Sequence, residues 1–184
     1  MRVITGKARG IQLKTPQGML TRPTADRVKE ALFSIIRFDV ANARVLDLFG
    51  GTGQLGIEAL SQGAKGAVFV DAREEACALI RENLKRTRLS EQGSVVRCDY
   101  LDYLNRCREK FNIIFLDPPY AEVFLETALK RIAEIDILHS SGIIVTERPL
   151  GKDLLAEFPG YTRSKDYKYG KTLLAIYRKE DGTL

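Results

Sequence analysis

The sequence predicts an α/β fold, a doubly wound and mostly parallel sheet of seven strands, in a single domain that spans residues 1–184. Two observations support this prediction. Of the 184 residues, 45% are hydrophobic, which suffices for one large core without disulfides or metals. From residue 44 onward, short apolar runs alternate with amphipathic stretches, a rhythm typical of βαβ units with helices on both faces of a sheet.

The first part of the chain reads as an extension that precedes the sheet. Residues 1–14 alternate loosely between apolar and polar, and Gly6 and Gly10 supply turn positions, so a small hairpin is expected within residues 1–20. A helix should follow, with Thr24 as a possible N-cap. It is indicated by apolar residues at the spacing of one helix face, namely Val28, Ala31, Leu32, Ile35 and Ile36.

The remaining elements alternate along the chain. Strands are expected at residues 44–48, 67–71, 94–98, 112–117 and 142–147, and helices at 55–62, 74–88, 101–110 and 124–135. Residues 161–167 and 172–177 form two further strand patterns joined by a short turn. One of these two strands should therefore run antiparallel to the rest of the sheet.

Composition narrows the classes of function. No apolar run reaches about 18 residues and no signal-peptide pattern is present, which predicts a cytoplasmic protein without membrane association. The three cysteines, Cys77, Cys98 and Cys107, lack metal-binding spacing, and His139 is the single histidine, so no metal site is expected. A monomer is the default expectation.

The net charge of +5 is distributed unevenly along the chain. Residues 1–40 carry eight Lys or Arg against three Asp or Glu, and residues 161–184 carry six against three, whereas the middle is mildly acidic. Basic ends of this kind are compatible with ordinary solvated charges or with a surface that binds a polyanion.

A glycine-rich turn lies between the first predicted strand of the sheet and its helix. Residues 45–60 read VLDLFGGTGQLGIEAL, which contains G-x-G-x-x-G, and Asp71 ends the next strand. The pattern is typical of dinucleotide binding, or of a turn that needs positive φ. Asp47 argues against a pyrophosphate here, because a carboxylate suits a positively charged ligand. S-adenosylmethionine, which carries an ammonium group and no phosphate, fits this loop better.

An acid, two prolines and an aromatic end the fourth strand of the predicted sheet, where residues 114–120 read IFLDPPY. Prolines alone can terminate a strand. However, this strand end falls where a doubly wound sheet places its ligand crevice. Asp117 is therefore predicted to share that crevice with the glycine loop and Asp71.

These segments resemble known proteins. VLDLFGGTG with VFVDA is similar to the cofactor half of class I S-adenosylmethionine-dependent methyltransferases, and DPPY resembles their catalytic motif for exocyclic amino groups. MRVITGKARGIQL, TRPTADRVKEALF and FGGTGQLGIEALSQGA resemble the bacterial family that methylates the guanine N2 amino group of 16S ribosomal RNA. The resemblance covers nearly the whole chain and implies a Rossmann-like class I methyltransferase fold.

The resemblance also implies roles for individual residues. The first strand and loop would hold the methionine part of the cofactor, and Asp71 would hold the ribose. Ala72 and the residues after the third strand would lie beside the adenine, although Asp99 is almost equally explained as a helix cap. The implied cofactor-binding residues are Asp47, Phe49, Gly50, Gly51, Gly53, Asp71, Ala72, Asp99 and Tyr100.

The implied catalytic residues are Asp117, Pro118, Pro119 and Tyr120. The Asp117 carboxylate and the Pro118 carbonyl would accept hydrogen bonds from the amino group and hold its lone pair toward the methyl-sulfonium. Tyr120 would stack on a base removed from its helix. The implied partner is ribosomal RNA or the small-subunit particle. Its contacts would come from Arg2, Lys7, Arg9, Lys14, Arg22, Arg27, Lys168 and Lys171.

Three alternatives remain. An adenine-N6 DNA methyltransferase uses the same four-residue motif but usually carries a separate target-recognition region, for which no insertion exists here. An NAD-dependent oxidoreductase would explain the glycines and leave Asp47 and DPPY without a role. A non-catalytic RNA-binding module would keep the basic ends and should tolerate loss of Asp117.

Overall fold

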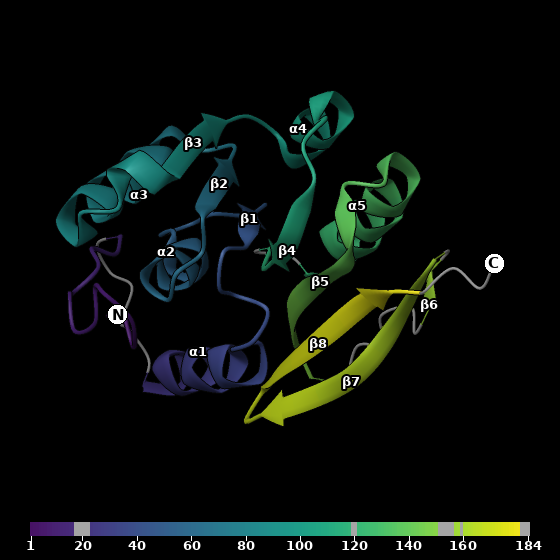
Figure 1. Ribbon diagram of the computed structural model, residues 1–184, viewed down its shortest axis with the longest axis horizontal. Coiled ribbons are helices and arrows are strands. Elements are labelled where there is room, and N and C mark those ends of the chain that lie inside the picture. Colours follow the sequence, from purple (N-terminus) through teal and green to yellow (C-terminus); the bar gives the residue numbers. More distant parts are fainter. Residues whose placement is uncertain (17–22, 119–120, 151–156, 159, 181–184) are drawn as a thin grey trace.

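A computed structural model describes residues 1–16, 23–118, 121–150, 157–158 and 160–180 (Figure 1). Its centre is one sheet with the strand order β3-β2-β1-β4-β5-β8-β7-β6. The strands are β1 (Arg44–Asp47), β2 (Gly66–Asp71), β3 (Gly93–Arg97), β4 (Phe111–Leu116), β5 (Leu138–Pro149), β6 (Glu157–Phe158), β7 (Tyr161–Tyr169) and β8 (Thr172–Lys179). All seven predicted strands are present, and the two-residue strand β6 adds to the outer edge of β7.

The first five strands are parallel and β8 runs antiparallel to both β5 and β7. The two central strands, β1 and β4, are almost wholly buried. Their near-continuous apolar runs, VL and IIFL, are typical of parallel strands covered on both faces. The predicted doubly wound α/β architecture is therefore confirmed, including the antiparallel strand near the C-terminus.

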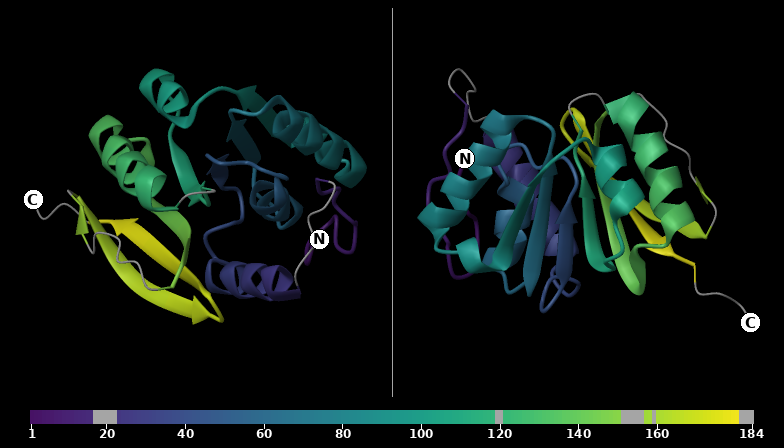
Figure 2. Two further views of the ribbon diagram at one scale, coloured as in Figure 1. Left: turned by 180° about the vertical axis from the view of Figure 1, so that it is seen from behind. Right: turned by 90° about the horizontal axis from the view of Figure 1, so that it is seen from above.

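Within the described residues, five α-helices cover the two faces of the sheet (Figure 2). They are α1 (Pro23–Ile35), α2 (Gln54–Ser61), α3 (Glu74–Thr87), α4 (Tyr100–Arg106) and α5 (Ala121–Ile135), and a short 3₁₀ turn, η1 (Ser90–Gln92), follows α3. Helices α1, α2 and α3 share one apolar cluster with alternate residues of the strands, whereas α4 and α5 share the other. The alternation places Val45 in the first cluster and Leu46 in the second.

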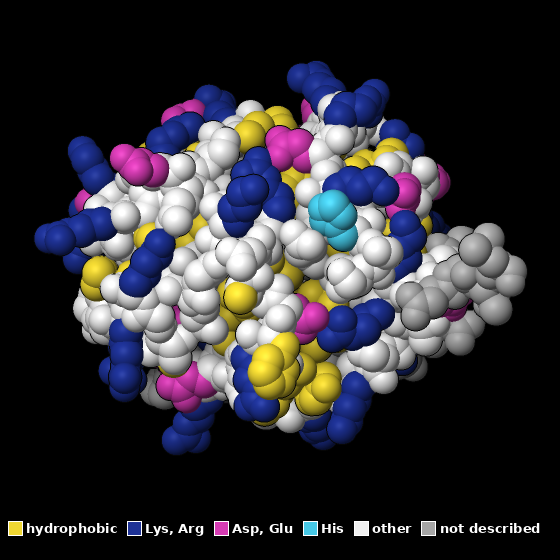
Figure 3. All heavy atoms as spheres, in the orientation of Figure 1, with side chains coloured by type: hydrophobic (Ala, Val, Ile, Leu, Met, Phe, Trp, Pro, Cys, Tyr) yellow, Lys and Arg dark blue, Asp and Glu magenta, His cyan; other side chains and the backbone are white. Residues whose placement is uncertain are grey.

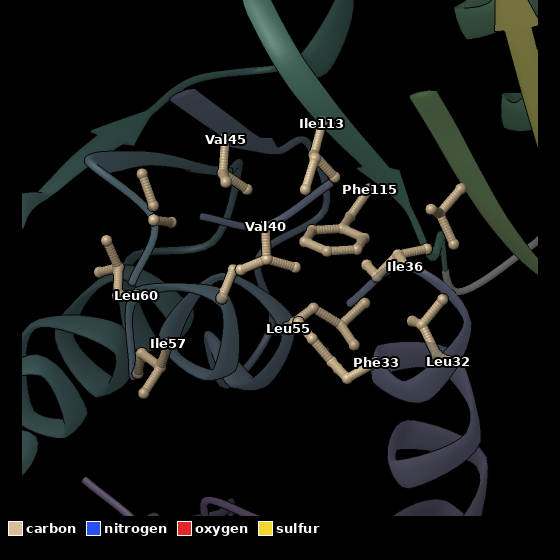
Figure 4. Packing of buried hydrophobic residues seen from close by; sticks show 14 of the residues in the cluster. Leu32, Phe33, Ile36, Val40, Val45, Leu55, Ile57, Leu60, Ile113 and Phe115 are labelled. Carbon is tan, nitrogen blue, oxygen red and sulfur yellow. The ribbon is translucent and has the colours of Figure 1, made fainter. Parts of the chain in front are cut away.

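Figure 4 shows the first cluster, in which side chains of α1 and α2 meet the strands. The rings of Phe33 on α1 and Phe115 on β4 lie 5.9 Å apart between centroids. Phe115 is fully buried. Burial of a side chain of this size contributes about 1.5–3 kcal/mol to folding, so this contact fixes α1 against the strand that leads to Asp117.

Three predicted helix boundaries are wrong. The helix expected at residues 124–135 begins at Ala121. The helix expected at residues 101–110 ends at Arg106, because residues 108–110 are all charged and exposed and give the helix no apolar side chain to bury. Thr24 is not the N-cap of α1, because Pro23 is already helical. Proline suits the first helical position, where its missing N–H would have no helical partner.

Residues 1–13 form the predicted hairpin, but with a single bridge in place of a continuous strand ladder. Arg2 and Gln12 make an isolated antiparallel bridge, and Val3 N donates to the carbonyl of Ile11 at 3.0 Å. No helix within the described ranges is both long and apolar enough to cross a lipid bilayer.

A buried ion pair anchors the hairpin to the helices. The Lys29 ammonium of α1 lies 3.4 Å from the Glu58 carboxylate of α2, and both side chains are almost completely buried. The backbone N–H groups of Ile4 and Thr5 donate to the same carboxylate at 2.8 and 2.9 Å. Lys29 also donates to the carbonyl of Arg2. Both residues come from segments that carry the family resemblance, so part of that signature is structural.

Candidate active site

Acidic residues gather where the parallel strands end, here called the carboxyl edge. Asp47 and Asp71 are the last residues of β1 and β2, Asp117 follows the last residue of β4, and Asp99 lies two residues beyond β3. The three strands β2, β1 and β4 are adjacent in the sheet. The structure thus brings the glycine loop, Asp71 and Asp117 to one edge, as the sequence predicts.

The glycine loop connects β1 to α2 by a tight turn. Gly51 and Gly53 have φ angles of 56° and 78°, a left-handed conformation that disfavours other residues. Gly53 N donates to the carbonyl of Gly50 at 2.6 Å, and α2 begins at the next residue. The turn directs the first backbone N–H groups of α2 toward the carboxyl edge, which suits a carboxylate of a ligand.

Asp47 is a buried carboxyl with one donor among the described residues, Gly56 N at 3.1 Å. Burial raises the pKa of Asp47 to about 8; the Gly56 hydrogen bond opposes this shift, and the nearby charges of Asp117 and Asp71 add to it. A buried acid of this kind is stabilised in its charged form by a cation. Asp47 is therefore a suitable partner for the ammonium group of a ligand.

Asp71 is held by the loop and by its own helix. One carboxylate oxygen accepts from Gly51 N at 2.9 Å and the other from Arg73 N at 2.9 Å, while the Arg73 guanidinium lies 3.2 Å away. The Arg73 side chain is largely exposed. A ribose could replace its guanidinium as a donor to Asp71 without disturbing the two backbone bonds. Ala72, expected beside the adenine, is exposed at the same edge.

An aromatic cluster lies beside the loop. The Tyr100 ring is 5.1 Å from Phe49 and 5.5 Å from Phe124 between centroids. Asp99 caps α4 by accepting from Leu101 N at 2.8 Å, so the helix-cap explanation of Asp99 is correct. Its second carboxylate oxygen has no donor among the described residues. Phe124 was not predicted, because its spacing on α5 reads as ordinary core.

The residues at this edge fit S-adenosylmethionine chemically. Asp47 can bind the ammonium group, the N–H groups at the start of α2 can bind the carboxylate, and Asp71 can bind the ribose. The aromatic cluster offers an apolar wall near the end of β3. In addition, the side-chain oxygen of Gln54, the first residue of α2, is buried and has no protein partner within the described part of the chain. Such an oxygen is available to a donor of the ligand.

Asp117 stands at the end of β4, next to the loop. Burial raises the pKa of Asp117 to about 6. Pro118 is buried behind it, whereas Pro119 and Tyr120 lie outside the described residues. Asp117 is therefore mostly ionised at neutral pH and sits in a partly desolvated place, where an accepted hydrogen bond is strengthened.

Glu147 on β5 is a site residue that the sequence did not reveal. Strand β5 pairs with β4 so that Thr146 lies opposite Leu116, which puts Glu147 level with Asp117. Burial and the Asp117 charge raise the pKa of Glu147 to about 8. Its only signal in the sequence was an acid at the end of the strand predicted at residues 142–147.

Some predicted RNA-contact residues flank this edge. Lys14 is tied to the glycine loop by Asn83, whose side chain bonds the backbone of Lys14 at 2.7 and 3.0 Å and the carbonyl of Thr52 at 2.9 Å. On the far side of the site, Lys168 and Lys171 are exposed at the turn between β7 and β8. That turn lies at the carboxyl edge because Thr172 pairs with Pro149, the last residue of β5.

The other predicted contacts do not share one edge. Arg2 follows Met1, whose sulfur accepts a hydrogen bond from the Thr52 hydroxyl of the glycine loop at 3.4 Å. Lys7 N donates to the carbonyl of Ser61, the last residue of α2, and its ammonium donates to Gln92 just before β3, so Lys7 lies at the opposite, amino edge. Arg9 and Arg27 are exposed, and Arg2 lies 3.9 Å from Asp26. Arg22 falls outside the described residues.

Positive charge is not confined to the carboxyl edge. Figure 3 shows the face that carries the single histidine, His139, at the beginning of β5 and therefore at the amino edge. Lys and Arg side chains are spread over this face too. Basic residues that contact a polyanion during the reaction must therefore be distinguished from other basic residues by their position relative to the site, because charge alone does not separate them.

Comparison with known protein families shows which family the chain belongs to. The model of the family described as "Conserved hypothetical protein 95" matches residues 1–178. The chain belongs to this family. It is 40% identical over 182 residues to the "Putative rRNA methyltransferase YlbH" of Bacillus subtilis, covering 97% of this chain and 99% of that protein. It is 34% identical to the "Ribosomal RNA small subunit methyltransferase D" of Haemophilus influenzae, with 97% and 93% covered.

Solved structures of similar proteins have the same fold as this chain. The "Putative methyltransferase yhhF from Escherichia coli" is 29% identical, covers 98% of each chain and superposes with a TM-score of 0.88. The structure described as "Crystal structure of SMU.776, a putative methyltransferase complexed with SAH" superposes with a TM-score of 0.67 at 20% identity, over 82% of this chain and 48% of that one. The second likeness shows the shared Rossmann-like fold of the family and its more distant neighbours.

Proposed function

We propose that this protein transfers a methyl group from S-adenosylmethionine to the exocyclic N2 amino group of a guanine in 16S ribosomal RNA. The observation that supports this most is the position of Asp117 and Pro118 at the carboxyl edge, beside the glycine loop and the buried acid Asp47. In addition, relatives of the chain are named rRNA methyltransferases. The enzyme would act in the cytoplasm as a monomer, with one methyltransferase domain over residues 1–184 and an N-terminal extension over 1–20.

The residues of the loop would bind and orient the cofactor. S-adenosylmethionine supplies an electrophilic methyl group on a positively charged sulfur. Asp47 would hold its ammonium, the start of α2 its carboxylate and Asp71 its ribose hydroxyls. Phe49 would line the methionine part, and Ala72 and Tyr100 would lie beside the adenine. Asp99 would accept a hydrogen bond from the adenine amino group.

Asp117 and Pro118 would position the nucleophile. The lone pair of a purine amino group is delocalised into the ring, so the nitrogen is a poor nucleophile. The Asp117 carboxylate and the Pro118 carbonyl would accept its two N–H groups and direct the lone pair at the methyl carbon. As the nitrogen–carbon bond forms, the carbon–sulfur bond breaks and its electron pair stays on sulfur. The nitrogen then loses a proton, which Asp117 would accept.

The RNA would approach the carboxyl edge between two basic borders. Lys14 lies on the side of the glycine loop, and Lys168 and Lys171 lie beyond β5. Basic side chains at these places can bind phosphates on both sides of a base that enters the site. Methylation of adenine N6 remains the second candidate, because the four-residue motif also serves that group.

The proposal is tested by transfer of labelled methyl groups from S-adenosylmethionine to small-subunit particles from cells that lack this protein. N2-methylguanine should be the labelled nucleoside, and Asp117→Ala should abolish labelling while leaving calorimetric binding of the cofactor largely intact. Label in N6-methyladenine would support the second candidate. Binding heat with NAD and none with S-adenosylmethionine would refute both.

A further inference from the structure

We propose that Glu147 selects guanine by accepting a hydrogen bond from its ring N1–H while Asp117 accepts from the neighbouring N2 amino group. This inference rests on the proposed function and assigns to Glu147 a role in recognition of the base. The two acids would then accept hydrogen bonds from two adjacent donors, N1–H and the N2 amino group, on one edge of the guanine.

The geometry of the sheet brings the two carboxyls side by side. Strands β4 and β5 are parallel neighbours whose register ends with Leu116 opposite Thr146, so the residues that follow, Asp117 and Glu147, are expected side by side. The Asp117 charge acts on Glu147, as it would at short range. Adjacent strands lie about 4.8 Å apart. By the alternation along each strand, Glu147 lies on the same face of the sheet as Val145, which belongs to the cluster of α1 and α2. Asp117 follows Phe115 on that same face.

Neither acid has a hydrogen-bond donor within the described part of the chain. This distinguishes them from the other acids of the edge, since Asp47, Asp71 and Asp99 each accept from backbone N–H groups. Glu147 is half-buried, and across the ladder on β8 it faces Leu174, which is apolar. Partly buried acceptors without donors are stabilised by a ligand that brings its own N–H groups.

Guanine matches this arrangement and adenine does not. Guanine presents N1–H and the N2 amino group next to each other, so two adjacent acceptors can bind both. Adenine presents the lone pair of N1 beside its N6 amino group, and that lone pair would face an acceptor oxygen of Glu147. A site built to accept a hydrogen bond discriminates strongly against an analogue that lacks the donor.

The arrangement persists when Glu147 holds a proton. With a pKa of Glu147 near 8 and a pKa of Asp117 near 6, the pair keeps about one proton at neutral pH. A neutral carboxyl that donates its proton to Asp117 still offers its carbonyl oxygen to N1–H. A glutamine at this position would offer the same carbonyl oxygen, whereas an alanine would offer none.

The experiment compares two RNAs that differ at the target base, guanine or 2-aminopurine, once the target position has been mapped in the methylation assay. 2-Aminopurine keeps the amino group and lacks the N1 hydrogen. The wild-type protein should prefer guanine by about 10- to 100-fold in kcat/KM, the range of one hydrogen bond to a partly buried partner. Glu147→Ala should reduce that preference to about threefold or less, and Glu147→Gln should keep it.

Glu134→Ala is the matched control, because Glu134 is an exposed acid on α5 whose partner is Arg131. It should leave the preference unchanged. An unchanged preference in Glu147→Ala overturns the inference. If Glu147→Ala is inactive on both RNAs, Glu147→Gln decides: guanine activity within about tenfold of wild type supports the role, and its loss overturns it. Failure of the proposed function is distinct, because then the wild-type protein would not methylate the guanine RNA at all.

Discussion

At the scale of single residues, the protonation of Asp117 controls the proposed chemistry. Burial raises the pKa of Asp117 to about 6, so the carboxylate is lost as the pH falls below that value. A neutral Asp117 holds the amino group less well and cannot accept its proton. We expect the single-turnover rate of methyl transfer to rise with pH through about 6 and then level off. A rate that does not change between pH 5 and 7 would contradict this assignment.

Asp47 should make the affinity for the cofactor depend on pH. In the empty site, burial raises the pKa of Asp47 to about 8, so Asp47 is neutral at pH 7. The ammonium of bound S-adenosylmethionine favours the carboxylate, so binding releases a proton and the affinity rises with pH. We expect an increase of up to about tenfold per pH unit between about pH 6 and 7.5.

Calorimetric titration of the wild-type protein and Asp47→Asn measures this dependence. The variant should bind more weakly at pH 7.5 and lose most of the dependence, because asparagine has no proton to release. Equal slopes for the two proteins would show that Asp47 does not contact the charged end of the cofactor.

At the scale of elements, the ion pair of Lys29 and Glu58 joins the N-terminal hairpin to α1 and α2. Glu58→Leu would remove the charged partner of the Lys29 ammonium and the acceptor of the N–H groups of Ile4 and Thr5. Removing one partner of a buried pair costs about 3–5 kcal/mol. Urea unfolding should show a loss of this size. The exposed pair of Arg131 and Glu134 provides the control, since Glu134→Leu should change the stability by less than about 1 kcal/mol.

The elements themselves were largely predictable, because their patterns are local. The glycine turn and the apolar runs of β1 and β4 are visible in the sequence, and the structure confirms both. The extent of β5 was not predictable, since the strand begins at Leu138 and includes His139 and two serines that are exposed. Pairing with β4 at Leu138 and with β8 at Pro149 extends this strand beyond its apolar centre, and pairing depends on distant residues.

At the scale of the whole molecule, distance from the site separates the basic residues. Lys168 and Lys171 border the carboxyl edge, whereas Lys7 lies at the amino edge. Replacing Lys168 and Lys171 together by alanine should weaken RNA binding and reduce the slope of log affinity against log salt by about one to two. Filter binding at several salt concentrations measures the slope. Lys7→Ala should leave it unchanged, and an equal effect of both variants would contradict a footprint at the carboxyl edge.

The site was predictable only where a motif carries it. Asp47, the loop glycines, Asp71 and Asp117 stand in recognisable patterns, and the strand order brings them to one edge. Glu147 has no motif, and its place beside Asp117 follows from the register of β4 and β5, which the sequence does not state. Likewise, nothing in the sequence separates Lys7 from Lys14, although their hydrogen bonds lead to opposite edges of the sheet.

The measurement that tests the central claim most directly is nucleoside analysis of 16S ribosomal RNA from cells that lack this protein. The account predicts that one N2-methylguanine disappears from the small subunit and returns when the wild-type protein is supplied. It should stay absent when Asp117→Ala is supplied at the same level. An unchanged content of N2-methylguanine in cells without the protein would contradict the account.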